Sequence, residues 1–363
     1  MSNVVQFAVA PRARSREACI PALLGAFAQS RRAIDDVFWL KENAELLNLL
    51  AVTGREVAPE ALEPLAGFYE NAAERLAFFP QYYRFILSIA LDMETLGWRG
   101  RVAEELCAMA ARSGLAQAEL SDLQRAEARR LLSQRRFADD VDAGLDDRLR
   151  AFMRRPETFA VPNKKAAYEL THIAFYLSDY GTRDPNLDAA AIDSLHFAGA
   201  VAYLEGNSDL LAEVSIALRY SGVACPQPWV EFLTVSRHEF HISEGQGRFA
   251  QDSYHDYLVC QWEAALSGQA LFDSAMPHLP NRFEKRRSGA VSPLREISEV
   301  LFLMDANARG TKASRHRRLT ETLSFHAKDR LEKLEAALPT RFGRFFDLFA
   351  RGESAGASVE VFA

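Results

Sequence analysis

Apolar residues recur at every third or fourth position along most of the chain, which is the spacing of one face of an α-helix. Glycine and proline fall between these runs, where helices are expected to end. No alternating run of five or more residues predicts a β-strand. We therefore expect an all-α protein, with helices over 19–52, 60–79, 81–98, 100–114, 118–137, 163–178, 187–204, 207–221, 228–241, 252–267, 294–307 and 319–338.

The loops between these runs are short, and short loops make consecutive helices antiparallel neighbours. The sequence has no consensus repeated at a fixed period, which argues against a regular solenoid. Antiparallel helix pairs of unequal sequence can instead close into an α/α toroid-like barrel. That barrel is the predicted architecture, and an irregular helical bundle is the alternative.

A chain of 363 residues allows one large domain or two ordinary ones. We expect a mobile leader over 1–18 and a helical-hairpin body with the candidate site over 19–278. A basic helical part over 279–350 is either a separate domain or the closing hairpins of the same one. Residues 351–363 form a predicted mobile tail.

The net charge of −6 is unevenly distributed. Residues 1–278 contain 27 Lys and Arg against 38 Asp and Glu, whereas residues 279–350 contain 15 against 9. The basic residues concentrate in 283–318. We interpret this segment as a solvated loop, and its alternative role is a docking surface for an acidic protein partner. These clusters lack interleaved aromatic residues and the body is acidic, which argues against nucleic acid.

Several features predict a cytoplasmic protein. No stretch approaches the length of a membrane span, and the basic residues of the N-terminus follow its apolar patch instead of preceding it, unlike a secretory signal. The four cysteines form no CxxC pair, which suits a reducing compartment.

Candidate chemistry concentrates in the middle of the chain, where six of the eight histidines lie between residues 172 and 278. Three follow a carboxylate at the same spacing: Glu169 and His172, Asp193 and His196, and Asp252 and His255. Positions three apart share a helix face. Such pairs serve in carboxylate–histidine metal sites, for iron or zinc, and in general acid–base catalysis without metal.

Ordinary structural roles compete with these readings. Asp252 can cap a helix N-terminus, and Asp193 can face solvent, as can His238 and His241 of HEFH. Glu169 and His172 differ because their neighbours are almost all apolar, and a buried carboxylate costs several kcal/mol unless it is paired. His255 has a comparable setting in SYHDYLVCQWEAAL.

Familiar motifs are absent. The chain has no P-loop and no GxGxxG, which predicts no nucleotide cofactor, and it has no HExxH and no GxSxG. The acidic run FADDVDAGLDD matches neither metal-binding order, DDxxD or DxDD, of the terpene cyclases.

The segment ELTHIAFYLSDYG with the later YHDYLV resembles a motif pair of uncharacterised bacterial all-helical proteins of similar length. The resemblance implies no reaction. It rests on positions spread over about a third of the chain: Glu169, Thr171, His172, Phe175, Tyr176, Asp179, Gly181 and His255.

Two functions follow from these patterns. The first is an enzyme acting on a small molecule or a peptide segment in a central, aromatic-lined cavity. The second is a non-catalytic helical scaffold for a protein or peptide partner. For the enzyme, the predicted catalytic residues are Glu169, His172, His255, Asp179 and Tyr180, and the predicted metal ligands are His172, His255, Glu169 and His196.

Overall fold

The computed structural model describes residues 19–138, 142–244, 252–272, 276–286, 289, 291–304 and 311–351. The predicted leader, and the predicted tail beyond Arg351, lie outside these residues. Contacts divide the chain into two units, each made of three separate segments. Unit 1 comprises the described parts of Met1–Ala118, Leu131–Ala138 and His238–Arg286, and unit 2 those of Glu119–Arg130, Asp139–Arg237 and Arg287–Ala363.

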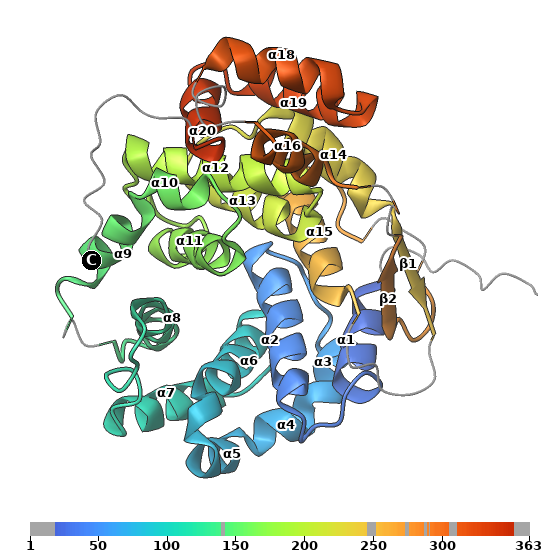
Figure 1. Ribbon diagram of the computed structural model, residues 1–363. Helices are drawn as coiled ribbons and strands as arrows, with labels where there is room; N and C mark the ends of the chain where they lie inside the picture. The colour runs from blue at the N-terminus through green and yellow to red at the C-terminus, as the bar shows by residue number, and fades with distance from the viewer. Residues whose placement is uncertain are drawn as a thin grey trace, which may run out of the picture. The chain divides into compact units, whose positions relative to one another are not determined.

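Unit 1 is a set of helices packed around α2 and α6 (Figure 1). The buried face of α2 carries Trp39, Leu46 and Leu50, and the Trp39 indole donates a 2.8 Å hydrogen bond to Ala28 O. Asp36 caps α2 by accepting from Phe38 N. The helices of this unit are α1 (Cys19–Gln29), α2 (Val37–Val52), α3 (Pro59–Leu62), α4 (Ala66–Glu70), α5 (Ala72–Phe78), α6 (Tyr83–Thr95), α7 (Val102–Arg112) and α15 (Tyr254–Leu266), with 3₁₀ turns at Glu63–Leu65 and Pro80–Tyr82.

Unit 1 also contains a small antiparallel sheet that the sequence pattern did not predict. Strand β1 (Phe240–Ser243) pairs with β2 (Arg282–Lys285). Phe240 and Phe283 of this ribbon pack against the buried ring of Tyr257, at centroid distances of 5.5 and 5.1 Å. Strands of four residues are too short to show a clear alternation.

Unit 2 is organised around α12, which is buried on nearly every side. Gly199 of α12 lies under the ring of Trp229, where a Cβ atom would be 2.3 Å from the ring. Its helices are α9 (Leu145–Met153), α10 (Pro156–Phe159), α11 (Lys164–Leu177), α12 (Ala189–Glu205), α13 (Ser208–Tyr220), α14 (Gln227–Arg237), α16 (Pro293–Phe302), α18 (Lys312–Thr322), α19 (Phe325–Ala337) and α20 (Phe342–Phe349). Helix α8 (Asp122–Ser133) contributes residues to both units.

The all-α prediction is confirmed, with β1 and β2 as a minor exception. Helix α14 ends at Arg237, so the predicted helix over 228–241 was too long. The run 319–338 falls in two helices because Ser324 caps a new one by accepting from Ala327 N. The toroid-like closure and the domain boundaries stay predictions. Among the described residues, no helix is long and apolar enough to cross a membrane.

Candidate functional site

Two neighbouring helices of unit 2, α11 and α13, carry a polar cluster around the predicted motif. Each helix begins at an asparagine: Asn163 accepts from Ala166 N, and Asn207 accepts from Leu210 N. These caps fix where each helix starts and therefore which side chains face the other helix. We call the resulting group the α11–α13 cluster; its members are Tyr168, Thr171, His172, Asp209 and Glu213.

A buried carboxylate anchors the cluster. The side chain of Glu213 is 2% exposed, and its Oε2 atom lies 2.5 Å from Thr171 Oγ1. The Thr171 hydroxyl also lies 2.8 Å from Tyr168 O. A hydroxyl has one proton to donate. We assign that proton to the carboxylate, because the contact with Glu213 is the shorter one and a charged acceptor makes the stronger hydrogen bond.

A second carboxylate in the cluster binds a phenol. Tyr168 Oη donates to Asp209 Oδ2 over 2.6 Å. Burial and, next, the charge of Asp209 raise the pKa of Tyr168 well above its ordinary value. Tyr168 therefore stays protonated and acts as a hydrogen-bond donor.

His172 is a partly exposed member of the cluster, as are Tyr168 and Asp209. Its Nδ1 lies 2.8 Å from Tyr168 O, one turn earlier in α11. A carbonyl oxygen can only accept, so Nδ1 carries the proton and Nε2 is the basic nitrogen of the neutral ring. The side chain is 35% exposed and is flanked by Phe175 and Tyr176. Glu213 Oε2 lies 3.5 Å from Nδ1, on the side of the ring away from Nε2.

The turn that ends α11 is held in an unusual backbone conformation. Asp179, Tyr180 and Gly181 have φ angles of 44°, 53° and 86° in succession. Arg130 holds the first two, because its Nε donates to Asp179 Oδ1 over 2.8 Å and its guanidinium lies 4.2 Å from the Tyr180 ring centroid. A Cβ on Gly181 would be 2.4 Å from the Tyr220 ring. Left-handed backbone at non-glycine residues costs about 1–2 kcal/mol each.

Among the described residues, no hydrogen bond or ion pair joins the carboxylate to the histidine in any of the three predicted pairs. No described hydrogen bond or ion pair joins Glu169 to His172, and the carboxylate nearest the ring is Glu213. The half-buried Glu169 has no hydrogen bond or ion pair with a described residue. Spacing of three residues puts two side chains on one helix face, but it does not force them to bond.

The second pair separates because arginines compete for the carboxylate. Asp193 accepts from Arg341 Nε at 2.8 Å and from Arg344 Nη1 at 3.1 Å. Buried His196 places Nδ1 2.8 Å from Ile192 O. Burial lowers the pKa of His196, and the positive charge of Arg341 lowers it further.

The third pair belongs to unit 1, where a buried arginine binds Asp252. Arg31 reaches Asp252 with both terminal nitrogens, at 2.8 and 3.1 Å, and Glu42 with Nε at 2.7 Å. His255 Nε2 instead lies 3.9 Å from Glu45. His172 belongs to unit 2 and His255 to unit 1, and a site shared by the two stays a prediction.

Contacts within one unit account for some of the charges in the basic segment 283–318 and in the acidic run FADDVDAGLDD. In the basic segment 283–318, Lys285 pairs with Asp256, and buried Arg315 pairs with Asp347. In the acidic run, hydrogen bonds from Arg148 and, to a lesser extent, Arg125 lower the pKa of Asp142 to about 2. A protein partner at the basic segment stays a prediction.

Sequence reasoning missed Tyr168, Asp209 and Glu213. The signal was present in SDLLAEVSIALRY, where two carboxylates four residues apart interrupt an apolar run. Glu213 and Glu169 have similar apolar surroundings in the sequence. Only the packing of α13 on α11 decides which carboxylate is buried beside His172.

Fold and site together define an essentially all-α protein with a hydrogen-bonded polar cluster between two helices. The chain belongs to the family described as Domain of unknown function (DUF6902), whose family model matches residues 1–352. This agrees with the predicted membership of an uncharacterised family. Neither a curated protein nor a solved structure matches the chain.

Proposed function

We propose that the chain is an enzyme in which His172 transfers a proton to or from a small molecule or a peptide segment. The observation that carries this proposal is the 2.8 Å contact between His172 Nδ1 and Tyr168 O. That contact fixes the tautomer and leaves the basic Nε2 for a substrate. A histidine held in one tautomer and open to solvent meets the geometric need of a general base.

The rest of the cluster positions the ring. When Nε2 takes a proton, the resulting imidazolium has the Glu213 carboxylate 3.5 Å from Nδ1. Thr171 holds that carboxylate in place. Glu213, Thr171 and Tyr168 are thus positioning residues, and the rings of Phe175 and Tyr176 pack beside the imidazole.

A metal-dependent version of the same proposal would use Nε2 of His172 as one iron or zinc ligand. Donation of the other ring nitrogen to a backbone carbonyl is usual for such a ligand. A catalytic zinc needs three protein ligands. Glu213 lies on the Nδ1 side of the ring, so it would not share a metal with Nε2.

The test incubates the purified full chain with a metabolite and peptide extract and follows every component by mass spectrometry. We expect at least one component to be consumed, and the loss to disappear in His172→Gln. His316→Gln changes an exposed histidine of α18 and serves as the matched control. Equal turnover by His172→Gln would exclude the proposed role. Turnover abolished by a chelator and restored by zinc or iron would select the metal-dependent version.

The alternative is a scaffold in which the α11–α13 cluster only stabilises the fold. Its supporting observation is that each carboxylate of the cluster already has a hydrogen-bond donor. In that case His172→Gln lowers stability and no component of the extract is turned over by the wild-type chain.

A further inference from the structure

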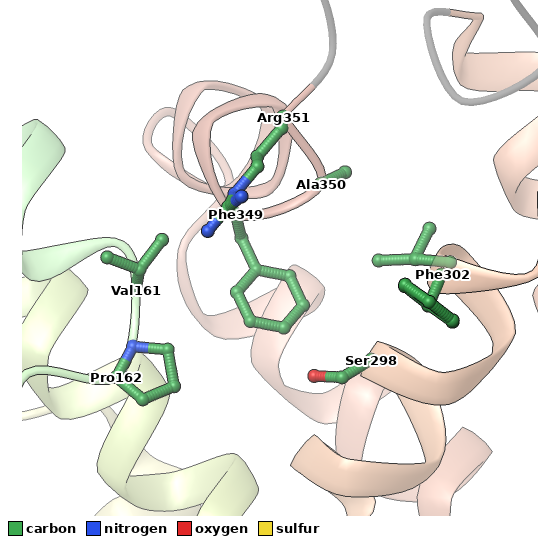
Figure 2. Close-up of a pocket in the computed structure, with 8 residues that line it drawn as sticks. Val161, Pro162, Ser298, Phe302, Phe349, Ala350 and Arg351 are labelled. Atoms are coloured by element: carbon green, nitrogen blue, oxygen red, sulfur yellow. The ribbon is translucent and has the colours of Figure 1, made fainter. Parts of the chain in front are cut away.

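A separate feature of unit 2 is an apolar pocket of about 270 Å³ between α16, α20 and the segment before α11. Phe349 and Leu301 supply much of its apolar wall, and Val161 and Pro162 line the side next to α11. Figure 2 shows Val161 and Arg351 on one side of this space and Ser298 and Phe302 on the other. None of the residues of the α11–α13 cluster lines it, so it is independent of the proposed catalytic site.

The described residues that line this pocket carry charge of one sign. Arg351 is the charged residue among them, and none of them is acidic. No hydrogen bond or ion pair joins the exposed Arg351 side chain to another described residue. A guanidinium beside an apolar wall is complementary to a carboxylate carrying an apolar chain.

The backbone conformation of Arg351 also supports a role of this residue in binding a carboxylate. Arg351 has φ 51° just after the end of α20, a position that glycine usually occupies. A left-handed arginine costs stability there, and strain of this kind concentrates at binding sites. The apolar surface also continues outside the pocket, since Phe302 is 80% exposed and Leu303 is 76% exposed.

From these observations we propose that this pocket binds an aliphatic monocarboxylate, with the carboxylate on Arg351 and the chain along Phe302 and Phe349. The volume of the pocket limits the length of the aliphatic chain that it can hold. A methylene group takes up roughly the space of a water molecule, about 30 Å³, so 270 Å³ holds about nine. Decanoate is therefore the probe of choice.

Calorimetric titration of the full chain with decanoate tests the proposal. We expect saturable binding of one decanoate per chain, no binding of acetate, and binding of decanol at least about tenfold weaker, because a charge-assisted bond is lost. Arg351→Gln should weaken decanoate at least about tenfold. The matched control Arg317→Gln, at an exposed arginine of α18, should leave it unchanged.

Two further variants separate binding from folding. Arg351→Gly should keep or raise the melting temperature, since it relieves the left-handed arginine, and yet weaken decanoate as much as Arg351→Gln. Ser298→Leu should fill the pocket and abolish binding. Among the described residues, the Ser298 hydroxyl bonds within α16 only, to Leu294 O.

Four outcomes would overturn the proposal. They are no saturable binding by the wild-type chain, equal affinity for decanol, unchanged affinity in both Arg351 variants, and binding that requires deletion of residues 352–363. The last result would assign the pocket to the chain's own end.

Discussion

The contact between Thr171 and Glu213 gives the sharpest stability test of the α11–α13 cluster. Thr171→Val keeps the shape of a fully buried side chain but removes the proton that reaches Glu213 Oε2 over 2.5 Å. A hydrogen bond to a charged group contributes about 1.5–3 kcal/mol. The new methyl group returns up to about 0.8 kcal/mol by burial. We expect a net loss of about 1–2 kcal/mol in the free energy of unfolding.

The assay is thermal unfolding followed by circular dichroism. For a cooperative unit of 150–250 residues, 1 kcal/mol shifts the melting temperature by about 2–4 °C. The expected decrease is therefore about 2–8 °C. Because other effects of valine can also lower stability, the same change is made in a Glu213→Met background.

In that background the acceptor is gone and the Thr171 hydroxyl can turn to Tyr168 O. Thr171→Val should then cost almost nothing, so the double-mutant cycle should give a coupling energy of about 1–2 kcal/mol. Thr171→Ser, which keeps the hydroxyl, should retain the coupling to Glu213. A coupling near zero would show that the 2.5 Å contact does not stabilise the fold, and the proposed positioning role of Thr171 would be wrong.

Three further predictions concern other parts of the structure. Gly181→Ala should lower stability by more than Gly206→Ala. Both glycines have positive φ, but a Cβ atom at Gly181 would also collide with the Tyr220 ring, whereas one at Gly206 meets nothing within 4 Å. Equal losses of stability would contradict the close packing at Gly181. Since burial lowers the pKa of His196 in the folded state, the unfolded chain binds more protons and stability should fall as the pH drops below about 6.5. His196→Gln should flatten that slope between pH 7 and 5, His316→Gln should not, and an unchanged slope in the first would refute the assignment. Arg31→Met should cost about 3–5 kcal/mol in denaturant titration, because it leaves Asp252 and Glu42 buried with fewer donors, and a cost below about 1 kcal/mol would contradict a buried ion-pair role.

The helical class and most helix positions could be read from the sequence because apolar periodicity and local caps decide them. The helix over 163–178 is an example: Asn163 starts α11 and the turn at Asp179–Gly181 ends it. The two short strands could not be predicted from the sequence, because their pairing joins residues about 40 positions apart and each strand is only four residues long.

The candidate site was predictable in part. The motif located His172 and Thr171, which make hydrogen bonds in the cluster, and Gly181, where a Cβ atom would collide with the Tyr220 ring. The partner of each carboxylate was not predictable, because it depends on residues distant in sequence, such as Arg341 for Asp193 and Arg31 for Asp252. Local spacing carries no information about such long-range competitors.

The most direct test of the central claim is the protonation state of the His172 ring. Nitrogen-15 spectra of the eight histidines, with His172 assigned by its loss in His172→Gln, report which ring nitrogen carries the proton. We predict a neutral ring protonated at Nδ1, with Nε2 unprotonated and sensitive to added ligands. A ring protonated at Nε2 would contradict the account, because its basic nitrogen would then face Tyr168 O and no substrate could use it.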